Sequence, residues 1–226
     1  MIVALDGPAG SGKSTVAKHL SQRLGIGYID SGAIYRTMAL FGMRRFGGCL
    51  GNERKIAEFF RGRPQELGIV YENDSQKMVL QGEEVSAEIR TPEVTGQVKY
   101  IADSVECREI ANAMLRRLSA ELSFVIDGRD IGTTVFPNAP FKFYLDARAE
   151  IRAARRAKDF GLPEEGEAFR HLLRDMRTRD AEDAARKVGP LAVAADAVVI
   201  DTSDLDIDGV VDRIGKEMKR CDREGL

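Results

Sequence analysis

The chain has 226 residues, of which 34 are basic and 36 acidic, and its formal net charge is −2. This length supports one core with inserted subdomains, and the near-neutral charge excludes a general electrostatic field that would recruit nucleic acid. No apolar run approaches the roughly 18 residues of a membrane span, and the N-terminal run is too short for a signal peptide, so we expect no membrane partner. The three widely spaced cysteines, Cys49, Cys107 and Cys221, favour a reducing cytoplasm over a disulfide framework.

The first predicted element is a buried strand over the apolar residues 2–5, followed by a helix over residues 14–24. Residues 7–14 (GPAGSGKS) lie between them and match the pattern G-x-x-x-x-G-K-[ST]. Glycines in such a loop allow backbone N–H groups to converge on phosphate oxygens, and the N-terminus of the next helix adds its dipole. We therefore predict a nucleoside triphosphate site in which Lys13 reaches the β- and γ-phosphates and the Ser14 hydroxyl binds Mg²⁺.

The expected ATP-binding residues of this loop and its helix are Gly7, Pro8, Ala9, Gly10, Ser11, Gly12, Lys13, Ser14 and Thr15. Such a loop leaves two classes of protein open: a nucleotide switch or motor, and a kinase that transfers the γ-phosphoryl group to a small acceptor. A GTPase would carry N-K-x-D for guanine, and the sequence contains no such tetrad. A kinase would add a second anion site and a lid.

Residues 26–30 predict a second strand, and Ser31 and Arg36, which follow it, suit a monoester phosphate. The serine hydroxyl can donate one hydrogen bond, and the guanidinium can bind two phosphate oxygens at once. The alternative is a helix N-cap at Ser31 with a solvated Arg36. These residues alone do not separate the two interpretations.

The first insertion spans residues 47–92. It predicts a helix over 53–60 and a small antiparallel hairpin from alternating runs at 68–74 and 77–83, with its turn at 73–75.

Three further apolar runs, over residues 124–127, 141–146 and 197–201, end in aspartate like the first two. The five runs predict short strands that alternate with helices, which is typical of a parallel sheet covered on both faces. Ligands of such sheets bind at the carboxyl ends of the strands. Asp30 and the charged residues at 127–130 are therefore expected at the same edge of the sheet as the phosphate loop.

The second insertion, residues 150–187, is helical and rich in arginine, with a break at 160–163. Helical spacing predicts two groups of side chains, each on one side of a helix. The groups are Arg152, Arg155 and Arg156, and Arg179, Asp183 and Arg186. Only Glu150 is near enough in sequence to balance the first group, so we expect Arg155 and Arg156 to contact ATP. The alternative for the first group is a solvated helix face. The alternative for the second group is a ladder of salt bridges within the helix.

These motifs together resemble the bacterial cytidylate kinase family. The matching stretches are GPAGSGKST, YIDSGAIYR, LQGEEVSAEIRTPEV, CRE, DGRDIGTTVFPNAPFKFYLDA, RDAEDAARKVGPL and AADAVVIDTS. The resemblance implies an α/β P-loop nucleoside-monophosphate-kinase fold, with a five-stranded parallel sheet flanked by helices, a nucleotide-binding insert and a lid. It also implies a cytoplasmic monomer that uses Mg²⁺ and transfers the γ-phosphoryl group of ATP to CMP or dCMP in pyrimidine nucleotide metabolism.

The same resemblance divides the chain into three kinds of region. The core would comprise residues 1–38, 109–150 and 188–226. The CMP-binding domain, with its small β insert, would comprise residues 39–108, and the lid would comprise residues 151–187. The stretch LQGEEVSAEIRTPEV matches the insert that separates this family from adenylate kinases.

Carried over by position, the resemblance also assigns the acceptor site. Ser31, Arg36 and Arg129 would hold the CMP phosphate, Arg108, Arg129 and Asp130 would surround the pyrimidine, and Asp183 would contact the ribose. The chemistry of cytosine agrees, because a carboxylate accepts from its amino group and arginine donates to its N3 and O2 atoms.

The expected catalytic residues are Lys13, Arg129, Arg179 and Arg186, the last two as lid residues that face the phosphates. Asp127, at a strand end, is expected to hold Mg²⁺ through water together with Ser14. Lys99 departs from the family pattern, which carries a serine beside the base. If Lys99 points into the site, it should narrow the preference for CMP over UMP; the alternative is that Lys99 faces solvent and Gln97 or Tyr100 supplies the contact. The alternatives are a kinase for UMP or another small phosphate acceptor and, from another class, a nucleotide switch.

Overall fold

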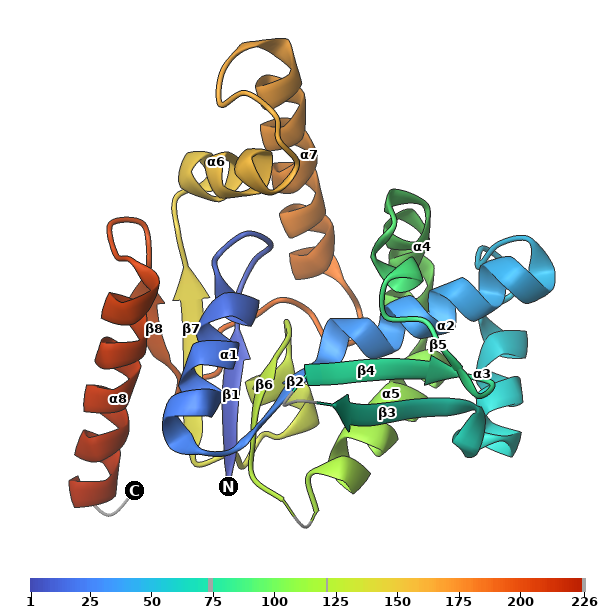
Figure 1. Ribbon diagram of the computed structural model, residues 1–226, viewed down its shortest axis with the longest axis horizontal. Helices are drawn as coiled ribbons and strands as arrows, with labels where there is room; N and C mark the ends of the chain where they lie inside the picture. The colour runs from blue at the N-terminus through green and yellow to red at the C-terminus, as the bar shows by residue number, and fades with distance from the viewer. Residues whose placement is uncertain (73–74, 121, 225–226) are drawn as a thin grey trace. The chain divides into compact units, whose positions relative to one another are not determined.

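The computed structural model describes residues 1–72, 75–120 and 122–224. The chain forms two compact units. The first, which we call the P-loop unit, comprises Met1–Ile26 and Ser123–Leu226, and the second, the insert unit, comprises Gly27–Leu122. Figure 1 shows the helices and strands of each.

Five short strands form the larger sheet, and each ends on aspartate. In order across the sheet they are β2 (Gly27–Asp30), β6 (Phe124–Asp127), β1 (Ile2–Asp6), β7 (Phe141–Asp146) and β8 (Val198–Asp201). β1 pairs in parallel with β6 and β7, and β7 pairs in parallel with β8. The predicted five-stranded parallel sheet is confirmed.

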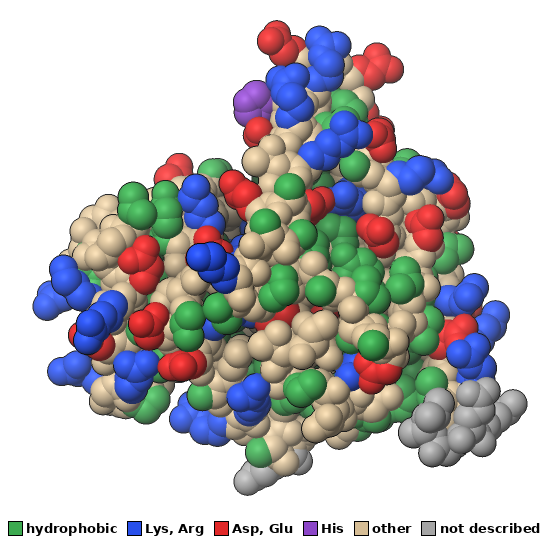
Figure 2. Space-filling view, turned by 180° about the vertical axis from the view of Figure 1, so that it is seen from behind, with side chains coloured by type: hydrophobic (Ala, Val, Ile, Leu, Met, Phe, Trp, Pro, Cys, Tyr) green, Lys and Arg blue, Asp and Glu red, His purple; other side chains and the backbone are tan. Residues whose placement is uncertain are grey.

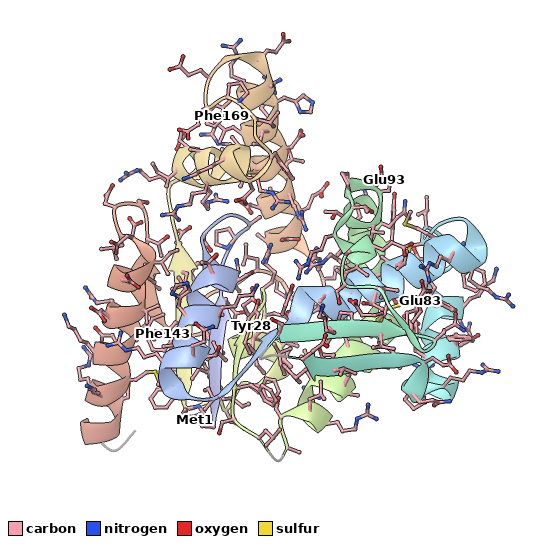
Figure 3. All side chains as sticks on the ribbon, viewed as in Figure 1. Met1, Tyr28, Glu83, Glu93, Phe143 and Phe169 are labelled. Carbon is pink, nitrogen blue, oxygen red and sulfur yellow. The ribbon has the colours of Figure 1, made fainter. Side chains whose placement is uncertain are left out.

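The register of the central strands places the ends of β1 and β6 level with each other. Leu5 pairs with Asp127 on β6 and with Phe143 on β7, and Figure 3 shows Phe143 within the sheet. Most apolar side chains of these strands are buried, as continuous apolar runs predict for strands covered on both faces. The loop that leaves β1 therefore begins beside Asp127.

The helices of the P-loop unit are α1 (Lys13–Leu24), α6 (Ala149–Asp159), α7 (Gly166–Ala185) and α8 (Ile207–Glu224), with a π-helical turn, η3 (Ile131–Val135). α1 contacts β6 and α8, and α6 packs against α7 (Figure 1). The predicted break at 160–163 is confirmed, because α6 ends at Asp159. The placement of Arg186 on the same helix as Arg179 is wrong: α7 ends at Ala185, and Arg186 is extended. The chain turns back there, and the Leu191 N–H donates to the Asp183 carbonyl at 2.9 Å.

The insert unit contains both helices and a small sheet. Its helical elements are α2 (Ser31–Phe46), α3 (Glu53–Gly62), η1 (Pro64–Glu66), η2 (Glu88–Arg90), α4 (Pro92–Asp103) and α5 (Val105–Leu118). Its sheet is antiparallel, in the order β3 (Leu67–Glu72), β4 (Ser75–Leu80) and β5 (Glu83–Glu84).

The predicted helix at 53–60 and the predicted hairpin are both confirmed, the hairpin with shorter strands. Of its predicted turn, residues 73–74 lie outside the described residues and Ser75 belongs to β4. The sequence did not predict β5, because two exposed glutamates carry no apolar alternation.

Phenylalanines join α2 to α3. The rings of Phe41 and Phe59 stack at 4.3 Å between centroids, and Phe60 meets Phe41 at 4.9 Å. Aromatic pairs in this geometry stabilise a core beyond the area that they bury. α3 is thereby held against the helix that follows β2.

The surface in Figure 2 carries interspersed basic and acidic side chains. This mixture agrees with the formal net charge of −2. Within the part of the chain that the structure describes, every helix is too short or too polar to cross a membrane.

Candidate active site

The loop between β1 and α1 requires glycine at several positions. Gly7, Gly10 and Gly12 have φ values of 146°, 77° and 87°, which other residues rarely adopt. A Cβ atom on Gly7 would lie 2.1 Å from the Leu145 carbonyl oxygen. Gly12 is the N-cap of α1 and offers no side-chain cap. The N–H groups of the first turn therefore face a site that a phosphate can occupy.

Lys13 is buried under this loop, with 5% of its surface exposed. Its Nζ atom donates to the Pro8 carbonyl at 2.6 Å and to Ser11 Oγ at 3.3 Å. Burial lowers the pKa of Lys13, and the nearby charge of Arg129 lowers it further, while Asp127 and Asp6 oppose the shift. An anionic ligand would favour the charged form, so the site is prepared for phosphate.

A hydroxyl and a carboxylate meet beside the loop. Ser14, on the first turn of α1, donates to the Asp127 carboxylate at 2.8 Å. The sheet register explains this contact, because Asp127 stands level with the end of β1. Oxygen atoms of this kind are the ligands that Mg²⁺ prefers. Thr15, the last of the ATP-binding residues predicted for this loop and its helix, follows on the same turn of α1.

Asp6 supports the segment that carries Arg129 and Asp130. Its carboxylate accepts from the Ile131 N–H at 2.8 Å and from the Gly132 N–H at 2.7 Å. Burial raises the pKa of Asp6 to about 6 although these hydrogen bonds oppose the shift. The sequence pattern did not indicate this role, because Asp6 and η3 are more than 120 residues apart.

Asp183 joins two of the predicted catalytic arginines. Arg129 Nε donates to it at 3.0 Å, and Arg186 donates at 2.5 Å. Burial disfavours the charged carboxylate, but Arg129 and Arg186 outweigh burial and lower the pKa of Asp183, with a contribution from Arg179. The structure thus brings Arg129, Arg179, Asp183 and Arg186 together, and Asp130 lies buried on the same segment as Arg129.

The arginines of α6 do not share one environment. Arg152 is buried and donates to the Ala9 carbonyl at 2.9 Å and to Asp180 at 2.5 Å. Its balancing charge therefore comes from Asp180 on α7, and Glu150, the only acidic residue near this group in sequence, pairs with Arg177. The sequence did not indicate Asp180 as the partner of Arg152, because the two residues are 28 positions apart and meet only where α6 packs against α7.

The two α6 arginines that were expected at ATP also differ from each other. Arg155 donates to the Thr202 hydroxyl at 3.0 Å and to the Thr202 carbonyl at 2.6 Å. Thr202 in turn bonds to the Ser11 carbonyl, so Arg155 adjoins the phosphate loop. Arg156 lies over the Phe160 ring at 4.3 Å. Their contact with ATP stays a prediction.

The insert unit holds the residues expected at the acceptor phosphate. Asp30, and not Ser31, is the N-cap of α2, because its carboxylate accepts from the Ala33 N–H at 3.1 Å. The same carboxylate accepts from Arg36 at 2.6 Å and from Arg90 at 3.1 Å. Burial opposes the charged form of Asp30, but the two arginines outweigh it and lower the pKa. Ser31 directly follows Asp30.

Arg90 is a candidate site residue that the sequence did not reveal. It lies in a stretch that was interpreted only as part of the insert, and it reaches Asp30 across 60 residues. A second arginine beside Arg36 doubles the positive charge at the end of β2. Such a pair suits a dianionic monoester phosphate.

Two residues expected near the base also lie in the insert unit. Arg108 is buried, donates to the Ala102 carbonyl at 3.3 Å, and stands 5.6 Å from the Tyr35 ring. Lys99 is exposed on α4, with its ammonium 5.1 Å from the Tyr100 ring. The insert unit therefore carries Ser31, Arg36 and Arg108, while the P-loop unit carries Arg129, Asp130 and Asp183.

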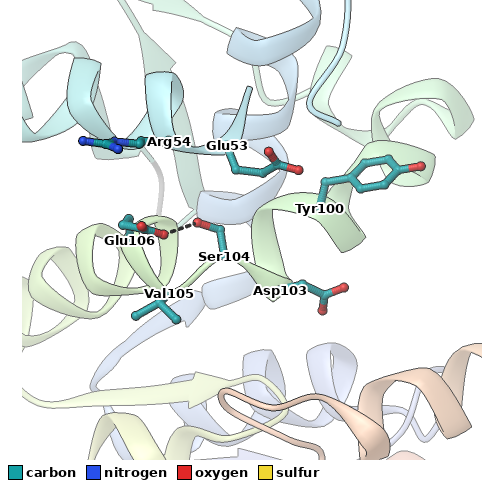
Figure 4. A pocket seen from close by; sticks show the side chains of 7 residues that line it. All are labelled: Glu53, Arg54, Tyr100, Asp103, Ser104, Val105 and Glu106. Atoms are coloured by element: carbon teal, nitrogen blue, oxygen red, sulfur yellow. Dashed lines mark hydrogen bonds between the residues drawn. The ribbon is translucent and has the colours of Figure 1, made fainter. Parts of the chain in front are cut away.

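A separate cavity of about 420 Å³ opens where α4 meets α5 (Figure 4). Glu53, Asp103 and Glu106 line it together with Ser104, whose hydroxyl bonds to Glu106 at 3.0 Å. Ser104 is also the N-cap of α5, since its hydroxyl accepts from the Cys107 N–H at 3.3 Å. The polar contacts in this cavity are thus those of a helix start, and it contains none of the predicted site residues.

A glycine loop between a parallel strand and a helix, with a buried lysine and a serine–carboxylate pair, defines a P-loop nucleotide-binding protein. The family model for cytidylate kinase matches residues 3–220. The chain belongs to the cytidylate kinase family and is a phosphotransferase.

Curated relatives support the same assignment. The cytidylate kinase of Desulforamulus reducens is 42% identical and covers 94% of this chain and 94% of its own. That of Pseudomonas fluorescens is 39% identical, over 99% of this chain and 97% of its own. Among solved structures, an uncharacterized protein from Eubacterium ventriosum has a TM-score of 0.51 at 14% identity, with 97% of this chain and 98% of its own covered. Shikimate kinase from Bacteroides thetaiotaomicron has a TM-score of 0.50 at 15% identity, with the same coverage, and both show the fold alone.

Proposed function

We propose that this protein transfers the γ-phosphoryl group of ATP to CMP or dCMP, giving CDP or dCDP and ADP. The observation that carries the proposal is the phosphate loop, with Lys13 buried beneath it and Ser14 bonded to Asp127. The family assignment supplies the acceptor class. The acceptor is an ionised phosphate, so the reaction needs positioning and neutralisation of charge rather than a general base.

Mg²⁺ is the metal that the donor set fits. The Ser14 hydroxyl and the Asp127 carboxylate are hard oxygen donors next to each other, and they would hold the ion directly or through water. When bound, the ion would neutralise charge on the β- and γ-phosphates. Lys13 would contribute a second positive charge at the same phosphates, because its ammonium is already held under the loop.

The arginines around Asp183 would act on the transferring group. Asp183 holds Arg129 and Arg186 by hydrogen bonds in the structure, and it would also accept from the ribose hydroxyl of CMP. With a ribose bound, the Asp183 carboxylate would divide its hydrogen bonds between the ribose hydroxyl and the arginines. The arginines would then turn toward the phosphates. Arg179, on the same helix as Asp183, adds a third charge.

Several side chains would recognise the acceptor. Ser31, Arg36 and Arg90 suit the phosphate, since two guanidiniums already converge on one carboxylate. Asp130 would accept from the cytosine amino group, and Arg108 would donate to the ring. We further propose closure of residues 151–187 as a lid over ATP, and binding of CMP by residues 39–108.

We also propose a cytoplasmic monomer. The three cysteines are free thiols, as a reducing compartment favours, and this one chain supplies both sets of binding residues.

A coupled assay of ADP release with CMP, dCMP, UMP, AMP and GMP tests the proposal. We expect kcat/KM to be highest with CMP or dCMP, and the ratio of CMP to UMP reports on Lys99. Comparable rates with UMP would make the enzyme a general pyrimidine kinase. Nucleotide binding without transfer to any of these acceptors would indicate a switch and overturn the proposal.

A further inference from the structure

A side chain of the small sheet holds the backbone of Asp30. Gln76, on β4, accepts from the Asp30 N–H at 2.7 Å through Oε1 and donates to the Asp30 carbonyl at 3.3 Å through Nε2. One amide group thus satisfies both backbone groups of a residue 46 positions away. Such paired contacts restrain position and orientation more than a single hydrogen bond does.

Asp30 is the residue through which this restraint reaches the acceptor site. Its carboxylate accepts from both Arg36 and Arg90, and its backbone leads directly into Ser31. A shift of the Asp30 backbone would move its carboxylate and with it both guanidiniums. The geometry of the phosphate-binding groups therefore depends on Gln76, although Gln76 does not itself belong to them.

The hairpin has a second contact with β2 that provides a comparison. Tyr71 is the cross-strand partner of Gln76, and its hydroxyl donates to the Tyr28 carbonyl at 3.1 Å. Figure 3 shows Tyr28 beside the hairpin. Burial raises the pKa of the Tyr71 hydroxyl, so this group stays protonated and donates. Tyr71 thus attaches the same hairpin to the same strand, but two residues before Asp30.

We propose that Gln76 is a positioning residue for the acceptor phosphate, which it serves by fixing the backbone of Asp30 and hence the guanidiniums of Arg36 and Arg90. The inference rests on the proposed function, because it takes these arginines to bind the phosphate of CMP. On this proposal the small antiparallel sheet contributes to substrate binding as well as to the packing of the insert unit.

The test compares Gln76→Met with Tyr71→Phe. Methionine keeps the length of the side chain and removes both amide contacts, whereas Tyr71→Phe removes one contact between the hairpin and β2. We expect Gln76→Met to raise KM for CMP about tenfold, as the loss of two neutral hydrogen bonds predicts, with KM for ATP within about twofold of wild type. Tyr71→Phe should leave both KM values within about twofold, while thermal denaturation shows a similar loss of Tm in both variants.

A double variant locates the effect. If Gln76 acts through Asp30 and Arg36, adding Gln76→Met to Arg36→Ala should raise KM for CMP by much less than it does in the wild-type background. Equal KM increases in Gln76→Met and Tyr71→Phe, or an additive effect in the double variant, would show that Gln76 only docks the hairpin and would overturn the inference. If Gln76→Met fails to fold, Gln76→Glu, which keeps the acceptor for the Asp30 N–H, is expected to raise KM for CMP selectively. Absence of transfer to CMP in the wild-type enzyme would instead refute the proposed function.

Discussion

The hydroxyl of Ser14 donates a hydrogen bond to the carboxylate of Asp127 at 2.8 Å. The two residues are 113 positions apart and meet because parallel pairing brings the ends of β1 and β6 level. A hydroxyl and a carboxylate that already share a hydrogen bond can exchange it for a shared cation without moving far.

The first prediction concerns this pair and Mg²⁺. Asp127→Asn removes the negative charge but keeps the shape, so the Mg²⁺ concentration for half-maximal activity should rise about tenfold or more. The measurement is initial rate against Mg²⁺ at saturating ATP and CMP. Asp146→Asn is the matched control, since Asp146 also ends a strand but is exposed. An unchanged Mg²⁺ dependence in Asp127→Asn would exclude Asp127 from the metal site.

The second prediction separates catalysis from folding at Lys13. Its ammonium is buried, and Arg129 repels it, so Lys13→Ala should leave Tm close to that of wild type. Turnover should be abolished, because the loop would lose its charge at the β- and γ-phosphates. Thermal melts and kcat measure the two effects, with Lys18→Ala, an exposed lysine of the same helix, as control. Retention of a tenth or more of kcat would contradict the assignment.

The third prediction concerns the acceptor phosphate. Arg36→Lys replaces a bidentate guanidinium by a point charge, and kcat/KM for CMP should fall on the order of 10²-fold. KM for ATP should change far less, because the phosphate loop belongs to the other unit. Arg44→Lys, at an exposed arginine of the same helix, should leave both values near wild type. Similar losses for both substrates would place Arg36 outside the acceptor site.

The fourth prediction concerns the helices α6 and α7. Amide hydrogen exchange over residues 149–185 should slow when an ATP analogue and CMP bind together, and it should slow less with either alone. The cause is the arginines around Asp183, which would bridge the helix to both nucleotides. Exchange in α8 serves as the internal reference. Unchanged exchange in α6 and α7 with both nucleotides bound would eliminate the lid.

The fifth prediction concerns pH. Burial raises the pKa of Asp6 from 3.8 to about 6, so the folded protein binds this proton more tightly than the unfolded chain does. The stabilisation from the protonated form is complete below the unfolded pKa and is lost as pH rises through the folded pKa. The Asp6 contribution to the free energy of unfolding should therefore fall by about 2 kcal/mol between pH 4 and 7.

Urea unfolding of wild type and Asp6→Asn across this range isolates that contribution. Asp201→Asn is the control, because Asp201 is exposed and hydrogen bonds from Ser203 lower its pKa, so it should show no such fall. If Asp6→Asn does not fold, the ¹³C shift of the Asp6 carboxyl gives the midpoint directly. A midpoint near 4 would contradict the prediction.

Local sequence predicts the phosphate loop well for a physical reason. Its glycines, its lysine and its serine are contiguous, and the positive φ values at Gly10 and Gly12 are a property of glycine itself. The strands were also predictable, since short apolar runs that end in aspartate are preserved in β1 and β6. These features depend on neighbours along the chain and not on distant partners.

Other parts of the site depend on contacts between residues that the sequence keeps apart. The Arg90 guanidinium meets Asp30 across 60 residues, and Gln76 meets the Asp30 backbone across 46. A charged or amide side chain is compatible with many partners, and only packing selects one of them. The sequence by itself therefore predicted where phosphate would bind and determined which family the motifs resemble. The tertiary structure alone decided which carboxylate aligns the arginines, because that choice rests on the distance between folded segments.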